Sequence, residues 1–418
     1  MKQGFDDKLT VDARNREPSG TYRTQRTARA AHTFEVEPEE KSKLLSHATG
    51  RLGEDLDNDP LIGTTIDGRY TLERVIARGA MGCVYLGTQR SLSRPVAVKI
   101  LDPKGGEEDR VFQERFFREA AVLARLQHPN TVRVIDYGAW KGRTYLVLEY
   151  VNGHSLRRLQ SGGPIPPARL VHIATQICDA LHEAHALGLI HRDLKPANVL
   201  LTRHAGALDV VKVVDFGLAK EFHKPRELTQ AGQVLGTPMY MAPEQIRDEA
   251  IDQRVDIWAL GVLMYRSITG KPPFDKGPAM KVLMANLEEV APPFAIAAPE
   301  VQAPKCLEQV VMCCLEKKAD DRFANVQEMN KALQICEIAL ERADWADVTF
   351  EVVDGRVVIP EGLIEAGDGT IRVVLPRSRI AVDASPIHQA HMRTVYLMAA
   401  TSAFAGVLGV ALGWIFAS

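Results

Sequence analysis

The pattern of apolar and polar residues separates the first part of the chain from the rest. Residues 1 to about 63 are rich in charge and poor in apolar side chains, with no lasting periodicity. This composition is typical of disorder, so we predict a disordered N-terminal tail. The stretch 22–29 is locally basic, which we interpret as a solvated tail; the alternative is a docking segment, or self-phosphorylation at Thr24 or Thr27.

β-type runs of residues begin near residue 70 and predict a small β-rich lobe. Two such runs flank Gly79 and Gly82. Three further strands are expected, at 95–100, 132–135 and 145–148. Between the first and second of these, a helix is predicted from an apolar face made of Phe116, Ala120 and Leu123.

After residue 153 the pattern becomes mostly helical, which predicts a larger α-rich lobe. One helix carries five apolar residues on a single face: Leu170, Ile173, Ile177, Leu181 and Ala184. The two lobes together predict an α+β architecture with its chemistry at the join.

A third pattern follows residue 341. Asp354-Gly355 and Asp368-Gly369 lie beside β-type runs, and an Asp-Gly pair between such runs is a strong hairpin signal. We predict a small β element at about residues 348–382. It is too small for a core of its own, so it should pack on the preceding lobe or on a copy of itself.

The stretch from Thr394 to Ser418 contains no charged residue. Since about 20 apolar residues span a bilayer core, we predict a transmembrane helix at 394–417, with a buried core helix as the alternative. Tyr396 and Trp414 lie near its ends, as interfacial anchors do. Small residues repeat on one face, where two copies could pack as a homodimer; ordinary membrane-helix composition explains the repeat equally well. They are Ala405, Gly409 and Gly413.

Composition narrows the function classes without selecting one. The 418 residues are 46% hydrophobic and 25% charged with a net charge of −2, so no basic excess points to nucleic acid as the main partner. None of the six cysteines forms a C-x-x-C pair, which argues against a zinc site and favours reduced thiols. The first residues lack the apolar core of a secretory signal. We expect four parts: a tail at 1–63, a domain at 64–341, a juxtamembrane segment with the β element at 342–393, and the helix at 394–417.

Two motifs about twenty residues apart carry the candidate chemistry. The first reads His191-Arg192-Asp193-Leu194-Lys195-Pro196-Ala197-Asn198. The second, Asp215-Phe216-Gly217, directly follows an apolar run at 210–214. Together they place a proton acceptor and two metal-binding side chains close in sequence, which is what phosphoryl transfer from ATP to a hydroxyl requires.

Residues 70 to about 338 resemble a protein kinase catalytic domain of the eukaryotic-like (Hanks) type, and in detail the bacterial Ser/Thr kinases. The motifs occur in that family's order over nearly two thirds of the chain, which makes the match more specific than any single motif. The resemblance implies a bilobal protein-kinase fold with a small β-rich N-lobe and a larger α-helical C-lobe.

The resemblance also implies a nucleotide site for ATP. Gly79 and Gly82, in a glycine-rich loop, would let backbone amides approach the phosphates, while Ala77 stands at the family's first glycine position. Four residues would surround the adenine: Glu149 and Val151 through their backbone, and Val84 and Ala97 through their side chains.

The residues of the reaction follow from the same resemblance. Lys99 would contact the phosphates and pair with Glu119, with Glu114 as the less well matched alternative. Asp193 would accept the proton of the substrate hydroxyl, and Lys195 would neutralise charge on the migrating phosphoryl group. Two oxygen-bearing side chains are the expected ligands of Mg²⁺, with Mn²⁺ as an alternative ion: Asn198 and Asp215.

A later segment, which closes at Ala242-Pro243-Glu244, resembles an activation loop. Thr229 matches the position at which bacterial relatives phosphorylate themselves. We hypothesise that phosphorylated Thr229 orders this loop through Arg192, which precedes the catalytic Asp; a solvent-exposed threonine without such a role is the alternative. Thr237 is expected to shape the substrate site.

Two further matches concern the large lobe. Asp256-Ile257-Trp258 resembles the buried anchor helix of that lobe. Arg322 is placed to pair with Glu244, and such a buried ion pair would be structural.

The sequence thus predicts a protein Ser/Thr kinase (EC 2.7.11.1 type) that acts in bacterial signal transduction, phosphorylates itself and is tethered to the membrane. Its need for ATP places the kinase on the cytoplasmic face of the inner membrane, and Arg393 fits a cytoplasmic flank. A pseudokinase scaffold that binds ATP and partners without catalysis is the first alternative, although its usual losses are not seen here. The second is a small-molecule kinase on a related fold, against which the peptide-docking segment 236–244 argues.

Overall fold

The computed structural model describes residues 59–79, 82–101, 107–216, 238–274, 277–342 and 347–374, with side chains from residue 112 onward in the third range. These residues all belong to one of the two units into which the chain divides, Leu56–Ser418. Some predictions fall outside them: the tail up to residue 58 with Thr24 and Thr27, the loop residues Thr229 and Thr237, and the helix at 394–417 with Ala405, Gly409 and Gly413. Within the described ranges, no helix is long and apolar enough to cross a membrane.

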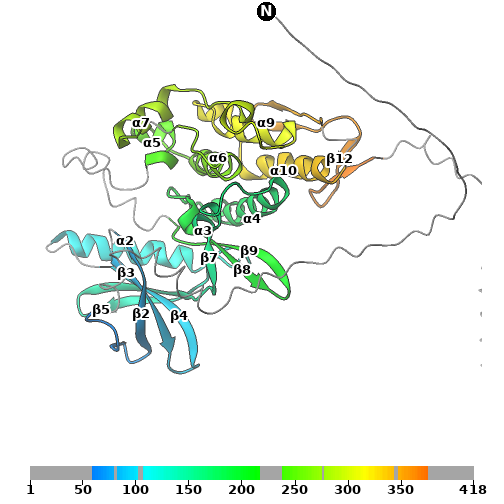
Figure 1. Cartoon of the computed structure of the whole chain (residues 1–418). Coiled ribbons are helices and arrows are strands. Elements are labelled where there is room, and N and C mark those ends of the chain that lie inside the picture. The colour runs from blue at the N-terminus through cyan, green and yellow to red at the C-terminus, as the bar shows by residue number, and fades with distance from the viewer. Residues whose placement is uncertain are drawn as a thin grey trace, which may run out of the picture. The chain divides into compact units, whose positions relative to one another are not determined.

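The small lobe is built on a six-stranded antiparallel sheet with the order β1-β2-β3-β4-β6-β5 (Figure 1). Its strands are β1 Thr65–Ile66, β2 Tyr70–Gly79, β3 Gly82–Gln89, β4 Arg94–Leu101, β5 Val134–Trp140 and β6 Arg143–Glu149. Side chains from one face, among them Leu72, Tyr85 and Val98, form the core of this lobe. The predicted strands are therefore confirmed, with β5 beginning two residues later than expected.

Helix α2, Glu107–Leu123, lies beside this sheet (Figure 1). Phe116 and Ala120 are fully buried and Leu123 nearly so, which confirms the predicted apolar face. All three belong to the same buried cluster as the helices of the large lobe. The apolar face of α2 thus belongs to a buried cluster that continues into the large lobe.

Residues 59–66 form an ordered N-terminal strap on the small lobe, so the predicted end of the disordered tail at residue 63 is wrong. Leu61 and Ile62 pack against the core of the lobe. The amide of Gly63 donates to the Leu72 carbonyl at 2.8 Å. Two adjacent apolar residues in a charged stretch are too weak a periodic signal to mark such a segment in advance.

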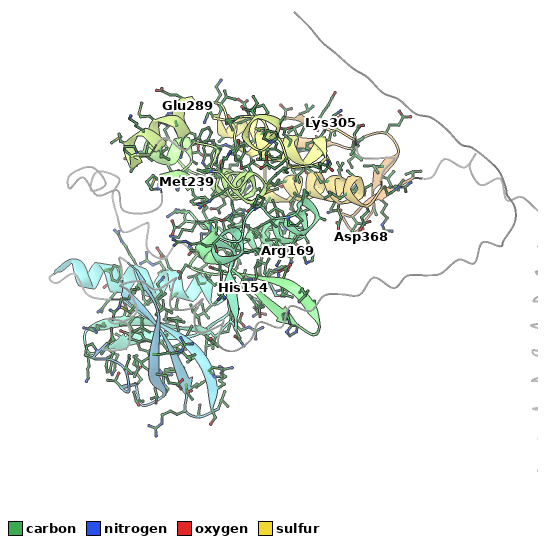
Figure 2. The ribbon with its side chains drawn as sticks, viewed as in Figure 1. His154, Arg169, Met239, Glu289, Lys305 and Asp368 are labelled. Carbon is green, nitrogen blue, oxygen red and sulfur yellow. The ribbon has the colours of Figure 1, made fainter. Side chains whose placement is uncertain are left out.

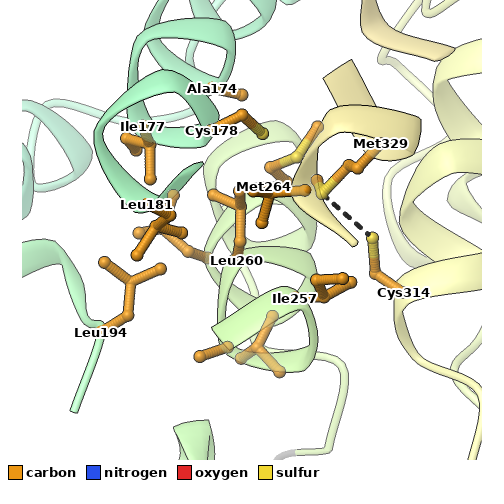
Figure 3. Close-up of a cluster of buried hydrophobic side chains, with 14 of the residues drawn as sticks. Ala174, Ile177, Cys178, Leu181, Leu194, Ile257, Leu260, Met264, Cys314 and Met329 are labelled. Carbon is orange, nitrogen blue, oxygen red and sulfur yellow. Dashed lines mark hydrogen bonds between the residues drawn. The ribbon is translucent and has the colours of Figure 1, made fainter. Parts of the chain in front are cut away.

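The large lobe is helical and is organised around α6, Arg254–Thr269, most of which is buried. Its other helices are α3 Leu156–Gln160, α4 Pro167–Ala186, α5 Pro243–Ile246, α7 Ala279–Glu288, α8 Phe294–Ala297, α9 Lys305–Cys314 and α10 Val326–Glu341. The five residues predicted on one face of α4 are all buried, as expected. Figure 3 shows how α4, α6 and α10 meet through Leu181, Leu260 and Met329.

A small three-stranded sheet, with the order β7-β8-β9, brings the two sequence motifs together. Its strands are β7 Gly153–Ser155, β8 Val199–His204 and β9 Ala207–Val213. The first motif leads through a 3-10 turn, Pro196–Asn198, into β8, and β9 leads into the second motif. Arg169 of α4 (Figure 2) secures β9 by two hydrogen bonds to Asp209, at 2.7 and 2.8 Å.

Two β-hairpins follow α10 and confirm the predicted β element as far as residue 374. They are β10 Glu351–Val353 with β11 Arg356–Val358, and β12 Leu363–Glu365 with β13 Ile371–Val373. Asp354 and Gly355 both have positive φ, 49° and 72°, as a two-residue hairpin turn requires. Phe350, Leu363 and Ile371 enter the core of the large lobe, so the element packs on the preceding lobe.

Candidate active site

The loop that carries Asp193 is held by a buried carboxylate from α6. Asp256, whose side chain is 1% exposed, accepts hydrogen bonds from the amides of His191 (2.8 Å) and Arg192 (2.9 Å). The ring of His185, from the end of α4, lies 2.8 Å from the same carboxylate. Arg192 has a positive φ of 60°, a conformation that costs a non-glycine residue about 1–3 kcal/mol. The two amide bonds to Asp256 keep the loop in this conformation.

His191 joins the two motifs. Its Nε2 lies 3.0 Å from the Val214 carbonyl, and its Nδ1 accepts from the Asp193 amide at 3.3 Å. Only the tautomer with hydrogen on Nε2 satisfies both contacts, because a carbonyl can only accept. The ring also packs on Phe216, with 4.8 Å between ring centroids. The buried histidine thus fixes Asp193 relative to the segment that carries Asp215.

The side chains expected to react lie within one network. The Lys195 ammonium donates to Asp193 Oδ2 at 2.7 Å. The Asn198 amide nitrogen donates to the Asp193 carbonyl at 2.9 Å. Asp193 is thereby oriented by a positive charge and an amide. Because the nitrogen of Asn198 is used in this bond, its oxygen remains as a metal ligand.

Lys99 of β4 meets the second motif directly. Its ammonium donates to Asp215 Oδ1 at 2.8 Å, and Asp215 has a positive φ of 59°. The Lys99 charge lowers the pKa of Asp215 below its ordinary value, against the opposite effect of burial, so this carboxylate is ionised at neutral pH. Among the contacts of the described residues, Lys99 bonds Asp215, and the ion pair predicted between Lys99 and Glu119 is not among them; Glu119 is half-buried on α2.

The oxygen donors fit a magnesium ion shared with phosphates. Asn198 and Asp215 each retain one oxygen outside the bonds described above. Mg²⁺ prefers oxygen ligands and is usually held by one or two carboxylates together with substrate phosphates. These two residues would hold the ion, and Lys99 beside them is placed to meet a phosphate.

The predicted adenine wall comes from β3, β4 and β6. Val84 pairs with Lys99, and Ala97 pairs with both Leu86 and Leu148 across the sheet. Gly82 has a φ of 141°, and a Cβ there would lie 1.9 Å from the Ile100 carbonyl oxygen, so only glycine fits.

The end of β6 carries the other predicted adenine contacts, at Glu149 and Val151. The amide of Glu149 donates to the Arg133 carbonyl at 3.0 Å. An amide donor for adenine must therefore come from another residue, for which Val151 is the prediction. The side chain of Glu149 accepts from Lys212 and so is turned to β9.

The large lobe contains one predicted support and one that the sequence did not reveal. Arg322, fully buried, forms two bonds with Glu244, at 2.6 and 2.8 Å, so the predicted ion pair is confirmed. Asn286 of α7 was not predicted, although it is fully buried and its amide nitrogen donates to the carbonyls of Pro238 and Met241. A polar residue in an otherwise apolar helix stretch was the available signal.

Comparison with known proteins assigns this arrangement. Residues 70–334 match the protein kinase domain family. The chain is 38% identical over 338 residues to serine/threonine-protein kinase Pkn1 of Myxococcus xanthus, covering 79% of this chain and 46% of that protein. It is 36% identical over 309 residues to the probable serine/threonine-protein kinase PknB of Lactococcus lactis, covering 73% of this chain and 48% of that protein. The chain thus spans about half the length of these curated relatives.

Solved structures give the same assignment. The crystal structure of the Mycobacterium tuberculosis PknI kinase domain superposes with a TM-score of 0.51 at 30% identity, covering 65% of this chain and 97% of that one. A second structure, Rad53 in complex with AMP-PNP, has a TM-score of 0.51 at 24% identity and shares the fold.

Proposed function

This chain belongs to the protein kinase domain family, and from that premise we propose that it transfers the γ-phosphoryl group of ATP to Ser or Thr hydroxyls of proteins. The observation that carries the proposal is the network around Asp193. Its carboxylate is bonded by Lys195 at 2.7 Å, and Asn198 and the Lys99–Asp215 pair complete the set. A pseudokinase scaffold is disfavoured because none of these five positions is altered.

The residues divide the reaction between them. Asp193 accepts the proton of the substrate hydroxyl while the oxygen of that hydroxyl forms a bond to the γ-phosphorus. At the same time, the bond between the γ-phosphorus and the leaving oxygen of ADP breaks. Lys195 neutralises charge on the migrating group, and Lys99 orients the phosphates. A bound Mg²⁺ would supply further neutralisation of the phosphates, with Asn198 and Asp215 as its protein ligands.

We propose regulation through Thr229 and Arg192. Asp256 fixes the backbone of Arg192, so the Arg192 side chain extends from a defined backbone position next to Asp193. A phosphate on Thr229 that pairs with this guanidinium would order the loop between the second motif and residue 242. Undiminished activity of a Thr229→Ala enzyme would refute the idea.

We also propose a tether to the cytoplasmic membrane through residues 394–417, with the kinase on the cytoplasmic side and Ala405, Gly409 and Gly413 as a homodimer face. The support is the uncharged sequence alone. Replacing Leu408 and Ala411 by arginine places two charges at the predicted bilayer centre. The full chain should then move from the membrane fraction to the soluble fraction, and an unchanged distribution of wild type and variant would contradict the tether.

The activity is tested by mapping phosphorylated residues. The full-length chain is incubated with Mg-ATP and a generic basic protein, and both are analysed by mass spectrometry. We expect phosphoserine and phosphothreonine on both proteins, with Thr229 among the phosphorylated residues of the chain itself. We expect no phosphorylation with Asp193→Asn. ATP binding by the wild type without any phosphate transfer would instead establish the pseudokinase.

A further inference from the structure

The N-terminal strap, residues 59–66, precedes the part of the chain that matches the kinase family, which begins at residue 70. It is nevertheless built into the small lobe. Thr65 and Ile66 pair with β2, and the Leu72 amide donates to the Thr64 carbonyl at 2.9 Å. The strap therefore has a fixed position relative to β2. Strands β2 and β3, which meet at Gly79 and Gly82, form the glycine-rich hairpin.

Asp59 is the first residue of the strap and has a buried carboxylate with three donors. Its side chain is 7% exposed. Oδ1 accepts from the Leu61 amide and the Tyr85 hydroxyl, both at 3.0 Å, and Oδ2 accepts from Arg78 at 2.8 Å. Three donors on one buried carboxylate indicate a built contact, because an ionised group is costly to bury without such partners.

The two side-chain donors come from opposite strands of the glycine-rich hairpin. Arg78 is the penultimate residue of β2, next to Gly79, and Tyr85 lies on β3. Arg78 pairs across the hairpin with Cys83, and its guanidinium also donates to the Cys83 sulfur at 3.2 Å. Asp59 thus connects both strands of the hairpin to the strap.

The contact involves the face of the hairpin that carries Tyr85 and packs into the core of the small lobe. Successive residues of a strand point to opposite faces, so Cys83 and Tyr85 share one face and Val84 occupies the other. Val84 is the residue expected to cover the adenine. Asp59 therefore acts on nucleotide only through the hairpin, and not by touching it.

The geometry points to Asp59 as a positioning residue that holds the glycine-rich hairpin in the position that ATP binding requires. Asp59 would therefore set the affinity for nucleotide rather than the rate of phosphoryl transfer. This inference rests on the proposed kinase function. It gives the strap a role that the family match, which excludes it, does not assign.

The electrostatics of the contact agree. Burial alone would raise the pKa of Asp59, but the bonds from Leu61, Tyr85 and Arg78 together lower it below its ordinary value. The carboxylate therefore carries its charge at neutral pH and can secure Arg78, whose side chain is 41% exposed.

The test separates nucleotide affinity from rate in the full-length chain. Asp59→Asn keeps the size of the side chain but removes the charge and turns an amide group toward the donors. We expect KM for ATP to rise about tenfold, the loss of one charged hydrogen bond, with kcat within about twofold. The Kd for Mg-AMP-PNP, measured by calorimetry, should rise by the same factor.

Asp67→Asn is the matched control. Asp67 follows the strap directly and also binds a tyrosine hydroxyl and an arginine, but these are Tyr145 and Arg69, outside the hairpin. Its KM for ATP should stay within about twofold of wild type. If Asp59→Asn does not fold, Tyr85→Phe, which removes one donor, should raise KM about threefold, on the lower limit of a single hydrogen bond.

The outcomes are distinguishable. Unchanged KM and Kd in Asp59→Asn overturn the inference while leaving the kinase function intact. If Asp59→Asn does not fold, unchanged KM and Kd in Tyr85→Phe have the same consequence. An equal rise in Asp67→Asn overturns it too, because the strap would then act only through stability. If the wild type transfers no phosphate, the proposed function fails, and the Kd for Mg-AMP-PNP still decides the role of Asp59.

Discussion

Two segments of the active site, the loop of Asp193 and the glycine-rich hairpin, are each held by a buried carboxylate from elsewhere in the chain. The loop is held by Asp256, which binds two backbone amides and a buried histidine. The hairpin is held by Asp59, which binds two side chains, one of them 41% exposed. Amides in a buried loop have almost no freedom, whereas a partly exposed arginine can rotate away.

The candidate site is therefore more rigid at the loop of Asp193 than at the glycine-rich hairpin. The loop must hold Asp193 and Asn198 in one geometry, because small displacements of reacting groups cost large factors in rate. The hairpin must open for nucleotide to enter and leave, which a side-chain contact permits. We therefore expect changes at Asp256 to affect kcat and changes at Asp59 to affect KM for ATP.

The largest expected effect is that of Asp256→Ala. It leaves the amides of His191 and Arg192 and the His185 ring without an acceptor, at about 1–3 kcal/mol for each buried donor. We predict a loss of at least about 3 kcal/mol in the free energy of unfolding and a fall in kcat of about 100-fold or more, measured by urea denaturation and steady-state kinetics.

The control for this variant is Asp252→Ala, which removes an exposed carboxylate that binds only Arg254 among the described side chains. It should change kcat by less than about twofold, as surface pairs contribute little. A rise in KM for ATP that is larger than the fall in kcat for Asp256→Ala would contradict this assignment of roles.

Gly82→Ala should have the next largest effect. Its Cβ would lie 1.9 Å from the Ile100 carbonyl oxygen, so β3 must move away from β4 and displace Val84. We predict that the Kd for Mg-AMP-PNP rises by at least about tenfold, since strain of this kind costs about 1–3 kcal/mol. Gly142→Ala, at a positive φ of 76° with open space around it, carries the strain without the clash. Equal Kd values for the two variants would contradict a specific role of the hairpin.

The smallest expected effect is in the pH dependence of stability. The pKa of Asp59 is lowered in the folded state, so its contribution is fully present above the unfolded-state value of about 4 and is lost as pH falls through the folded value. The difference in the free energy of unfolding between wild type and Asp59→Asn should be constant from about pH 5 to 7 and shrink below about pH 4. Urea denaturation across this range measures it, and a difference that grows toward acid would show that the sign is wrong.

Most of the candidate site could be assembled from the sequence because the residues expected to react lie close together along the chain. Asp193, Lys195 and Asn198 fall within one loop, and Lys99 and Asp215, which the sequence also predicted, form an ion pair in the structure. The two hairpins after α10 were also predictable, since an Asp-Gly turn is a local signal.

Contacts between distant residues were not predictable in the same way. Asp59 meets Arg78 and Tyr85 only after β1 pairs with β2, and nothing in its charged surroundings distinguishes it. The partner of Lys99 was assigned to Glu119 from the family pattern, whereas the structure pairs it with Asp215. Which of two carboxylates a lysine contacts depends on the placement of α2 against the sheet, which no local pattern encodes.

We expect Asp193 to act in phosphoryl transfer within a site that binds nucleotide without its help. This expectation is tested most directly by measuring both quantities on full-length wild type and Asp193→Asn: the Kd for Mg-AMP-PNP by calorimetry, and the transfer of phosphate from ATP to a generic basic protein. We predict that Kd stays within about threefold while transfer falls by at least about 100-fold, the lower limit for loss of a general base. Transfer retained in Asp193→Asn, or no transfer by the wild type despite tight binding, would contradict the account.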